Sequence, residues 1–256
     1  MDHSTDKEWK NNQSKADLER LKKEDEFIKS VPPRQLVNEF PLYIDRQNLV
    51  RYITLIKIFE RIRNVKGNIV ECGVFRGASL LLWAKLCAIY EPGNVYRQII
   101  GFDTFEGFPS IHEKDQEYQG VGYFDNTNIE TIQKSIDLYD ENRLAGHLQK
   151  IFLTKGDVVE TIPAYLDENP HTLISLLYLD FDIYEGTKVA LENFLPRMPK
   201  GAVIVFDELN EKRWAGETIA LLESLNLNNY RLEQFPEEAH ISFIQLDWEL
   251  LDYFIL

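Results

Sequence analysis

The feature that most constrains the fold is the alternation of short apolar runs with longer segments of helical spacing after Gly67. The run 173–179, LISLLYL, is typical of a strand that is covered on both faces of a sheet. We expect further strands at 68–72, 96–102, 150–154 and 202–206, and helices at 77–90, 129–139, 158–166, 185–194 and 217–225. This order predicts an α/β fold with a doubly wound, mostly parallel sheet, to which the 230–254 tail adds two strands to make seven.

The N-terminal segment differs in composition from the rest. Residues 1 to about 30 are rich in Lys, Asp, Glu and Asn, which is typical of a mobile arm or a solvated helix, and Pro32-Pro33 is expected to end it. After Asp45, a candidate N-cap, apolar residues from Leu49 to Ile62 follow helical spacing and predict a helix with one buried face. We therefore expect a charged N-terminal helical arm at 1–40 and an α/β domain at 41–256.

The charge and the cysteines exclude several classes of protein. The chain has 28 basic and 42 acidic residues, and a net charge of −14 disfavours binding to nucleic acid or to an anionic membrane. Cys72 and Cys87 lie in apolar runs without Cys-x-x-Cys spacing, which indicates neither a disulfide framework nor a zinc site. Because no apolar run approaches the roughly 20 residues that span a bilayer and no signal peptide is visible, a cytoplasmic protein is expected.

A glycine or a carboxylate follows each expected parallel strand. Ligands of doubly wound sheets bind at the carboxyl ends of the strands, so these positions are the first candidates for a site. In chain order they are Gly73 to Gly77, Asp103, Gly156-Asp157, Asp180 to Asp182 and Asp207-Glu208.

The segment from Glu71 to Ser79 joins the first strand to its helix. Gly73 and Gly77 allow a sharp turn, and free amides at the start of the helix can hold an anion. The segment lacks the G-x-G-x-x-G dinucleotide fingerprint, so a ligand with a carboxylate and no pyrophosphate, such as S-adenosylmethionine, fits better than NAD or FAD. Asp103 is then a candidate for the ribose hydroxyls and Asp157 for the adenine amino group, although either acid alone is equally typical of a helix N-cap.

Four acids follow two neighbouring strands. Positions i and i+2 of an extended chain point to the same side, so Asp180 and Asp182 are expected to converge, with Asp207 and Glu208 one strand away. Carboxylates this close repel one another unless a cation lies among them, and an all-oxygen set selects Mg²⁺, with Mn²⁺ or Ca²⁺ as alternatives. The competing interpretation is that these acids cap the helices that follow.

The segment 104–128 is long and without periodicity, and it carries Phe105, Phe108, Tyr118, Tyr123 and Phe124. Irregular segments at a ligand-binding edge are often lids or substrate clamps. The alternative is a surface loop with short helical turns.

Four motifs in order resemble the TylF/MycF (macrocin) O-methyltransferase family: VECGVFRG at 70–77, GFDTFEGFP at 101–109, LDFDIYEGT at 179–187 and FDE at 206–208. The resemblance covers about residues 35 to 235. It implies a class I, Rossmann-like, Mg²⁺-dependent methyltransferase domain that methylates sugar hydroxyls. In one departure, the family often has two aspartates where this chain has Asp207-Glu208.

The resemblance also implies roles for individual residues. Predicted contacts to S-adenosylmethionine are Glu71, Gly73, Phe75, Gly77, Ser79, Asp103, Thr104, Asp157 and Asp180. Asp180, Asp207 and Glu208 are the predicted metal ligands and Asp182 the general base. Tyr43, Phe108, Tyr184 and Trp214 are predicted to contact the substrate, and Glu217, in the same Trp-x-Gly-Glu segment as Trp214, is expected near it.

The expected reaction is transfer of a methyl group to a hydroxyl of a sugar, carried by an antibiotic glycoside, a nucleotide or a surface polysaccharide precursor. Three alternatives remain: a methyltransferase for a catechol or another small molecule, an oxidoreductase, and a non-catalytic nucleotide-binding protein. A homodimer or a higher homo-oligomer is compatible with the arm.

Overall fold

The computed structural model describes residues 15–115 and 127–246. The chain divides into two compact units, Met1–Ile53 and Thr54–Leu256, which are described separately. The predicted border between residues 40 and 41 lies inside the first unit and stays a prediction.

The first unit is helical where it is described. It contains α2 (Lys15–Lys29), α3 (Pro33–Asn38), η1 (Phe40–Leu42) and the start of α4 (Arg46–Ile62). Two forms were expected for the charged segment, a mobile arm or a solvated helix, and its described part, residues 15–29, is helical. Pro33 begins α3, which was not expected; proline fits a first helical position because the amide there needs no helical partner. Asp45 accepts a hydrogen bond from the Asn48 amide at 2.6 Å, which confirms its capping role.

The second unit is built on a seven-stranded sheet with the order β3-β2-β1-β4-β5-β7-β6. The strands are β1 (Asn68–Cys72), β2 (Ile99–Asp103), β3 (Ile151–Lys155), β4 (Ile174–Leu179), β5 (Val203–Phe206), β6 (Leu232–Phe235) and β7 (Glu238–Gln245). The first five are parallel, and the β6–β7 hairpin joins β5 through antiparallel pairing with β7. The predicted doubly wound, mostly parallel sheet is confirmed.

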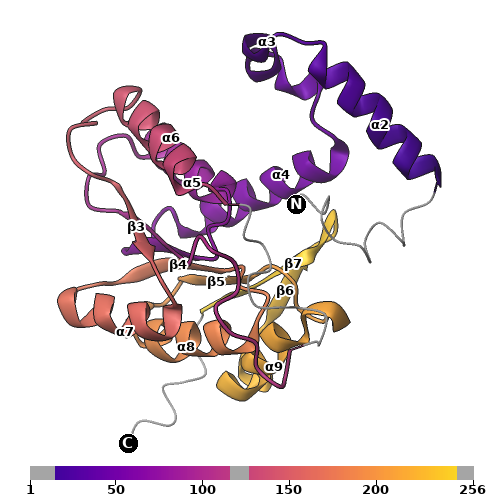
Figure 1. Ribbon diagram of the computed structural model, residues 1–256. Helices are drawn as coiled ribbons and strands as arrows, with labels where there is room; N and C mark the ends of the chain where they lie inside the picture. The colour runs from indigo at the N-terminus through magenta and orange to yellow at the C-terminus, as the bar shows by residue number, and fades with distance from the viewer. Residues whose placement is uncertain (1–14, 116–126, 247–256) are drawn as a thin grey trace, which may run out of the picture. The chain divides into compact units, whose positions relative to one another are not determined.

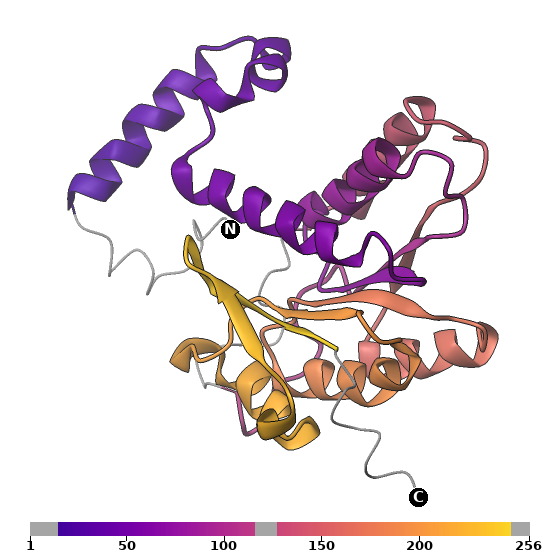
Figure 2. The same ribbon diagram turned by 180° about the vertical axis from the view of Figure 1, so that it is seen from behind.

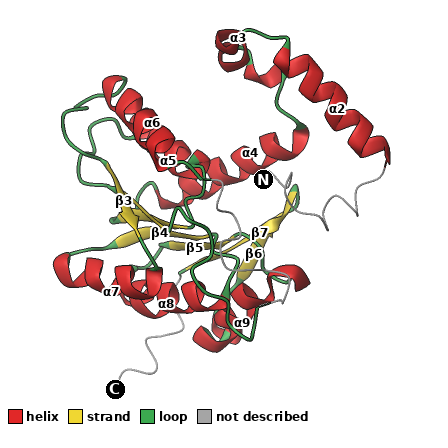
Figure 3. Ribbon diagram, in the orientation of Figure 1, coloured by secondary structure: helices red, strands yellow, loops and turns green. Residues whose placement is uncertain are grey.

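Helices cover both faces of this sheet (Figures 1 and 2). The helices of the second unit are the end of α4, α5 (Ala78–Tyr90), α6 (Ile129–Glu141), α7 (Val158–Glu168), α8 (Tyr184–Phe194) and α9 (Ala215–Ser224), with short turns η2 (Leu195–Arg197), η3 (Lys212–Trp214) and η4 (Leu227–Asn229). Figure 3 shows α4, α5 and α6 on one side of the strands and α7, α8 and α9 on the other.

Successive residues of the central strands point in turn to the two faces of the sheet, and each face has its own hydrophobic core. Leu176, Tyr178 and Val205 pack against α4, α5 and α6, whereas Leu177 and Leu179 pack against α7, α8 and α9. Both faces of the central strands are therefore apolar and buried, which is why their sequences read as continuous apolar runs.

The expected strand at 96–102 begins only at Ile99. The side chain of Asn94 accepts hydrogen bonds from the amides of Tyr96 and Arg97, which holds this stretch in a turn. The guanidinium of Arg97 then turns inward to the carbonyl oxygens of Gly67 and Val65. No helix in the described ranges is long and apolar enough to cross a membrane.

Candidate active site

The carboxyl ends of β1, β4 and β5 are hydrogen-bonded to one another beyond the last strand residues. The Asp180 amide donates to the carbonyl of Cys72 at 2.8 Å, and the Asp207 amide donates to that of Leu179 at 3.1 Å. Gly73 has φ of +89°, and a Cβ atom there would lie 1.9 Å from the carbonyl oxygen of Asp180. The turn after β1 and the acidic end of β4 are therefore in direct backbone contact, as the predicted site requires.

Glu71 is fully buried on β1. Its carboxylate accepts hydrogen bonds from the Ser79 hydroxyl at 2.8 Å and from the Trp83 indole nitrogen at 2.7 Å. Glu71 thus ties the turn after β1 to the first turns of α5. Gly77, with φ of +78°, begins that helix in the left-handed conformation that glycine adopts readily. The predicted contacts of Glu71, Gly77 and Ser79 with the cofactor stay predictions.

Asp103, at the end of β2, is held by two backbone amides. It accepts from Phe75 at 2.7 Å and from Phe105 at 2.6 Å, so one carboxylate joins the turn after β1 to the turn after β2. Burial raises the pKa of Asp103, and the backbone hydrogen bonds act in the opposite direction. The Thr104 hydroxyl donates to the carbonyl of Gly107 and closes the second turn.

Asp157 is the N-cap of α7 and accepts a hydrogen bond from the Val159 amide at 3.0 Å. The structure therefore shows the helix-capping role that was the alternative for Asp157. A capping carboxylate keeps further lone pairs for another donor, so the predicted adenine contact stays a prediction.

The acids after β4 and β5 form one cluster, in which Asp182, Asp207 and Glu208 are buried and Asp180 is half-buried. Burial raises the pKa of Asp182 well above its usual range, a side-chain hydrogen bond with Glu208 opposes this rise, and the negative charges of Asp180, Glu217 and Asp207 add to it. The four predicted carboxylates therefore lie together. The geometric reason given for their convergence is wrong, because Asp182 has φ of +63° and is not in extended geometry.

Glu217, in the first turn of α9, belongs to this cluster and is fully buried. Its Oε2 atom accepts a hydrogen bond from the Glu208 amide at 3.2 Å. Burial raises the pKa of Glu217 well above its usual range, and the charges of Glu208 and Asp207 raise it further. Only the resemblance placed Glu217 near the substrate. Because an acid in the first turn of a helix is ordinarily exposed, the sequence alone does not indicate its burial.

Residues 15–115 and 127–246 contain no group of three or more His, Cys, Asp or Glu side chains already arranged to hold a metal ion. The cluster nevertheless has the chemistry that a hard cation prefers, because all its donors are carboxylate oxygens. Asp182 Oδ1 and Glu217 Oε1 are buried without a hydrogen-bond partner. A divalent cation among these acids would offset their mutual repulsion, so the residues present fit such an ion.

Two of the predicted substrate contacts are neighbours. The Phe108 and Trp214 rings pack edge to face at 6.3 Å, and both are largely buried. The Tyr184 hydroxyl donates to Glu223 at 2.7 Å, and the Tyr184 amide donates to Asp115 at 2.8 Å. Tyr43 belongs to the first unit, where its ring lies 5.7 Å from that of Phe27. All four assignments stay predictions.

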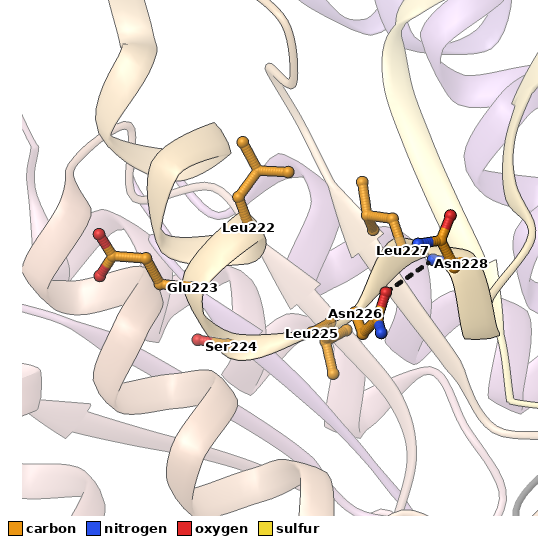
Figure 4. A pocket seen from close by; sticks show the side chains of 7 residues that line it. All are labelled: Leu222, Glu223, Ser224, Leu225, Asn226, Leu227 and Asn228. Atoms are coloured by element: carbon orange, nitrogen blue, oxygen red, sulfur yellow. Dashed lines mark hydrogen bonds between the residues drawn. The ribbon is translucent and has the colours of Figure 1, made fainter.

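Part of the expected lid, 116–126, lies outside the described residues, and Tyr118, Tyr123 and Phe124 with it. Figure 4 shows a hollow at the end of α9, which is lined by residues 222–228. None of the predicted site residues lines this hollow, so it lies apart from the predicted site.

Comparison with known proteins decides the family. The family model of macrocin-O-methyltransferase (TylF) matches residues 47–222, which is more than half of the chain. The chain belongs to the macrocin-O-methyltransferase family. The family predicted from the four motifs is confirmed, and with it membership in a group of O-methyltransferases.

Solved structures agree with this family. The crystal structure of CalS11, a calicheamicin methyltransferase, has a TM-score of 0.86 and 33% identity, over 91% of this chain and 94% of that one. An apo structure of CalS11, described as a TDP-rhamnose 3'-O-methyltransferase, has a TM-score of 0.78 and 32% identity, over 91% and 96%. The class I methyltransferase-like fold is therefore confirmed.

Curated relatives are more distant. A 4'-O-methyltransferase from Streptomyces olivaceus that acts on 8-demethyl-8-(2,3-dimethoxy-alpha-L-rhamnosyl)-tetracenomycin-C is 26% identical over 155 residues, 56% of this chain and 53% of that protein. Demethyldecarbamoylnovobiocin O-methyltransferase from Streptomyces niveus is 23% identical over 57% of this chain and 53% of that protein. The chain matches about half the length of these two relatives.

Proposed function

We propose that this protein transfers a methyl group from S-adenosylmethionine to a hydroxyl of a sugar, with Asp182 as the general base. The observation that carries the proposal is the acidic cluster beside the turn after β1, which joins the half-buried Asp180 to the buried Asp182, Asp207, Glu208 and Glu217. Family membership supplies the methyl donor, and the relatives named above for rhamnose derivatives supply the acceptor class.

The methyl donor is assigned to the turns after β1 and β2. Gly73 lets the turn after β1 come close to the backbone of Asp180, while Asp103 links the two turns through its bonds to Phe75 and Phe105. The Glu71 bonds to Ser79 and Trp83 fix the start of α5, whose free amides face an anionic group such as the methionine carboxylate. Positioning of this kind brings the methyl group into line with the acceptor oxygen.

Asp182 is the group that we expect to take the proton. Burial and the surrounding negative charges make its carboxylate more basic than a solvated one. The acceptor oxygen forms a bond to the methyl carbon as the carbon–sulfur bond breaks, its proton passes to Asp182, and the sulfur leaves as a neutral thioether. A base placed in this way contributes about 10²–10⁴-fold in rate.

Asp180, Asp207 and Glu208 are the residues that we expect to hold Mg²⁺. When bound, the ion supplies Lewis-acid stabilisation of the acceptor oxygen and offsets the repulsion within the cluster. The fully buried Asp207 carboxylate and the all-oxygen donor set support this assignment.

The base is tested with Asp182→Asn. We expect turnover to fall by roughly 10²–10⁴-fold, because the amide accepts no proton, while S-adenosylmethionine affinity by calorimetry stays within about twofold. Asp137→Asn, an exposed site on α6, serves as the matched control. Turnover of the Asp182 variant equal to that of the control would exclude Asp182 as the base.

The cation and the acceptor are tested separately on the unmodified protein. We expect EDTA to abolish turnover and Mg²⁺ to restore it, whereas full activity in EDTA rules out the cation. A panel of nucleotide-linked deoxysugars, glycosides and catechols then identifies the acceptor class, and methylation of catechols alone would replace the sugar proposal by the catechol alternative.

A further inference from the structure

A tyrosine that the proposed reaction leaves unused contacts the acidic cluster. Tyr178, on β4, is fully buried, and its hydroxyl donates a hydrogen bond to Asp207 Oδ1 at 2.6 Å, with Asp180 Oδ2 farther away at 3.5 Å. Tyr178 pairs in register with Glu71 on β1 and with Val205 on β5. Because Asp207 comes two residues after Val205, the side chains of these residues share the sheet face that α5 covers.

The ring of Tyr178 is itself held in place. The Trp83 ring packs against it edge to face, with the centroids 5.9 Å apart. The Trp83 indole nitrogen in turn donates to Glu71 Oε2 at 2.7 Å. A buried row of contacts therefore runs from Glu71, in the half of the site assigned to the methyl donor, to Asp207, in the half assigned to the cation.

We propose that Tyr178 is a positioning residue that fixes the Asp207 carboxylate for cation binding. This inference rests on the proposed function, since it assigns Tyr178 a task at the site where Mg²⁺ is expected. A buried O–H donor on one carboxylate oxygen removes the rotational freedom of the group and stabilises its charge. Partners of this kind orient the ligands of metal sites, and their loss typically weakens metal affinity by about 10–100-fold.

Tyr178→Phe tests the proposal, because it removes one oxygen and keeps the ring against Trp83. Mn²⁺ binding followed by electron paramagnetic resonance is expected to weaken by about 10–100-fold. The affinity for S-adenosylmethionine by calorimetry is expected to stay within about twofold. A merely structural tyrosine would lower the thermal midpoint and leave the Mn²⁺ affinity unchanged.

The matched control is Tyr139→Phe. Tyr139 is also buried, and its hydroxyl donates to the carbonyl of Ala84 at 2.8 Å, away from the acidic cluster. This variant loses one buried tyrosine hydrogen bond but is expected to bind Mn²⁺ as the wild type does. Equal Mn²⁺ affinities for the two variants would overturn the role of Tyr178.

A double-mutant cycle with Asp207→Asn keeps the test decisive if stability changes. If Tyr178 acts through Asp207, adding Tyr178→Phe to Asp207→Asn produces no further loss of Mn²⁺ affinity. Additive losses would contradict the proposal. Wild-type protein measured first separates the two claims: no Mn²⁺ binding there refutes the cation of the proposed function, whereas binding that Tyr178→Phe leaves intact refutes only this inference.

Discussion

Gly73→Ala is the substitution that most directly tests how the two halves of the site are joined. Gly73 lies in the turn after β1, and the added Cβ atom would meet the carbonyl oxygen of Asp180 at 1.9 Å. A backbone oxygen cannot rotate away as a side chain can. The variant must therefore separate the turn that we assign to the methyl donor from the acidic end of β4.

Two costs add in this variant. The φ of Gly73 is +89°, and an L-residue in left-handed geometry loses about 1–2 kcal/mol. Overpacking adds about 1–3 kcal/mol, so we expect a total of about 2–5 kcal/mol. For a chain of this size that lowers the thermal midpoint by roughly 4–20 °C.

Two other glycines separate these costs. Gly201 has a similar φ of +85°, but a Cβ atom there would meet only a Val65 side-chain carbon at 3.2 Å, so Gly201→Ala measures mainly backbone strain. Gly93 has no atom within 4 Å of such a Cβ atom, and Gly93→Ala is expected to change stability by less than about 0.5 kcal/mol.

Urea unfolding of the three variants, together with calorimetry of S-adenosylmethionine binding, measures both effects. We expect Gly73→Ala to lose more stability than Gly201→Ala and to bind the cofactor more weakly. If Gly73→Ala matches Gly93→Ala in stability and in cofactor affinity, the close contact with Asp180 has no energetic importance and the reasoning is refuted.

Burial raises the pKa of the Cys87 thiol to about 12, so thiol reagents at pH 8 should label it only upon unfolding; fast labelling of folded protein contradicts this. Since the thiol has a higher pKa in the folded state, its contribution to stability is complete below about pH 9 and is lost as the pH rises towards 12. Urea unfolding at several pH values should show this loss in the wild type and not in Cys87→Ala. Arg97→Lys removes the guanidinium that donates to buried carbonyl oxygens such as that of Val65. The free energy of unfolding in urea should fall by about 1–3 kcal/mol. Asp115→Ala leaves the buried Tyr184 amide without its acceptor and should cost a similar amount; no change excludes that bond as stabilising.

Much of the fold could be predicted because burial leaves a strong pattern in the sequence. The expected strand 68–72 coincides with β1, and the helix expected at 185–194 begins one residue earlier as α8. The start of β2 was placed three residues too early, because Tyr96 and Arg97 look like strand residues while the Asn94 side chain holds them in a turn. A side-chain hydrogen bond of this kind produces no periodic pattern in the sequence from which it could be predicted.

The acidic cluster could be predicted only in part. Four of its members follow strand ends, and the shared edge of a parallel sheet brings them together whatever the local backbone does. The left-handed turn at Asp182 and the arrival of Glu217 from α9 depend on tertiary packing. The Tyr178 hydroxyl could not be assigned either, because a tyrosine within an apolar run looks like an ordinary core residue.

The cluster is held in place by residues that oppose its tendency to separate. Burying four neighbouring acids beside the half-buried Asp180 works against folding, yet Tyr178 donates to Asp207 and the Glu208 amide donates to Glu217. These hydrogen bonds come from a side chain on β4 and from a backbone amide two residues after β5, so they immobilise few additional groups. The two apolar cores on either side of the sheet supply the stability that offsets the repulsion. A rigid scaffold of this kind holds mutually repelling carboxylates in one arrangement, as the proposed cation and hydroxyl substrate would require before either binds.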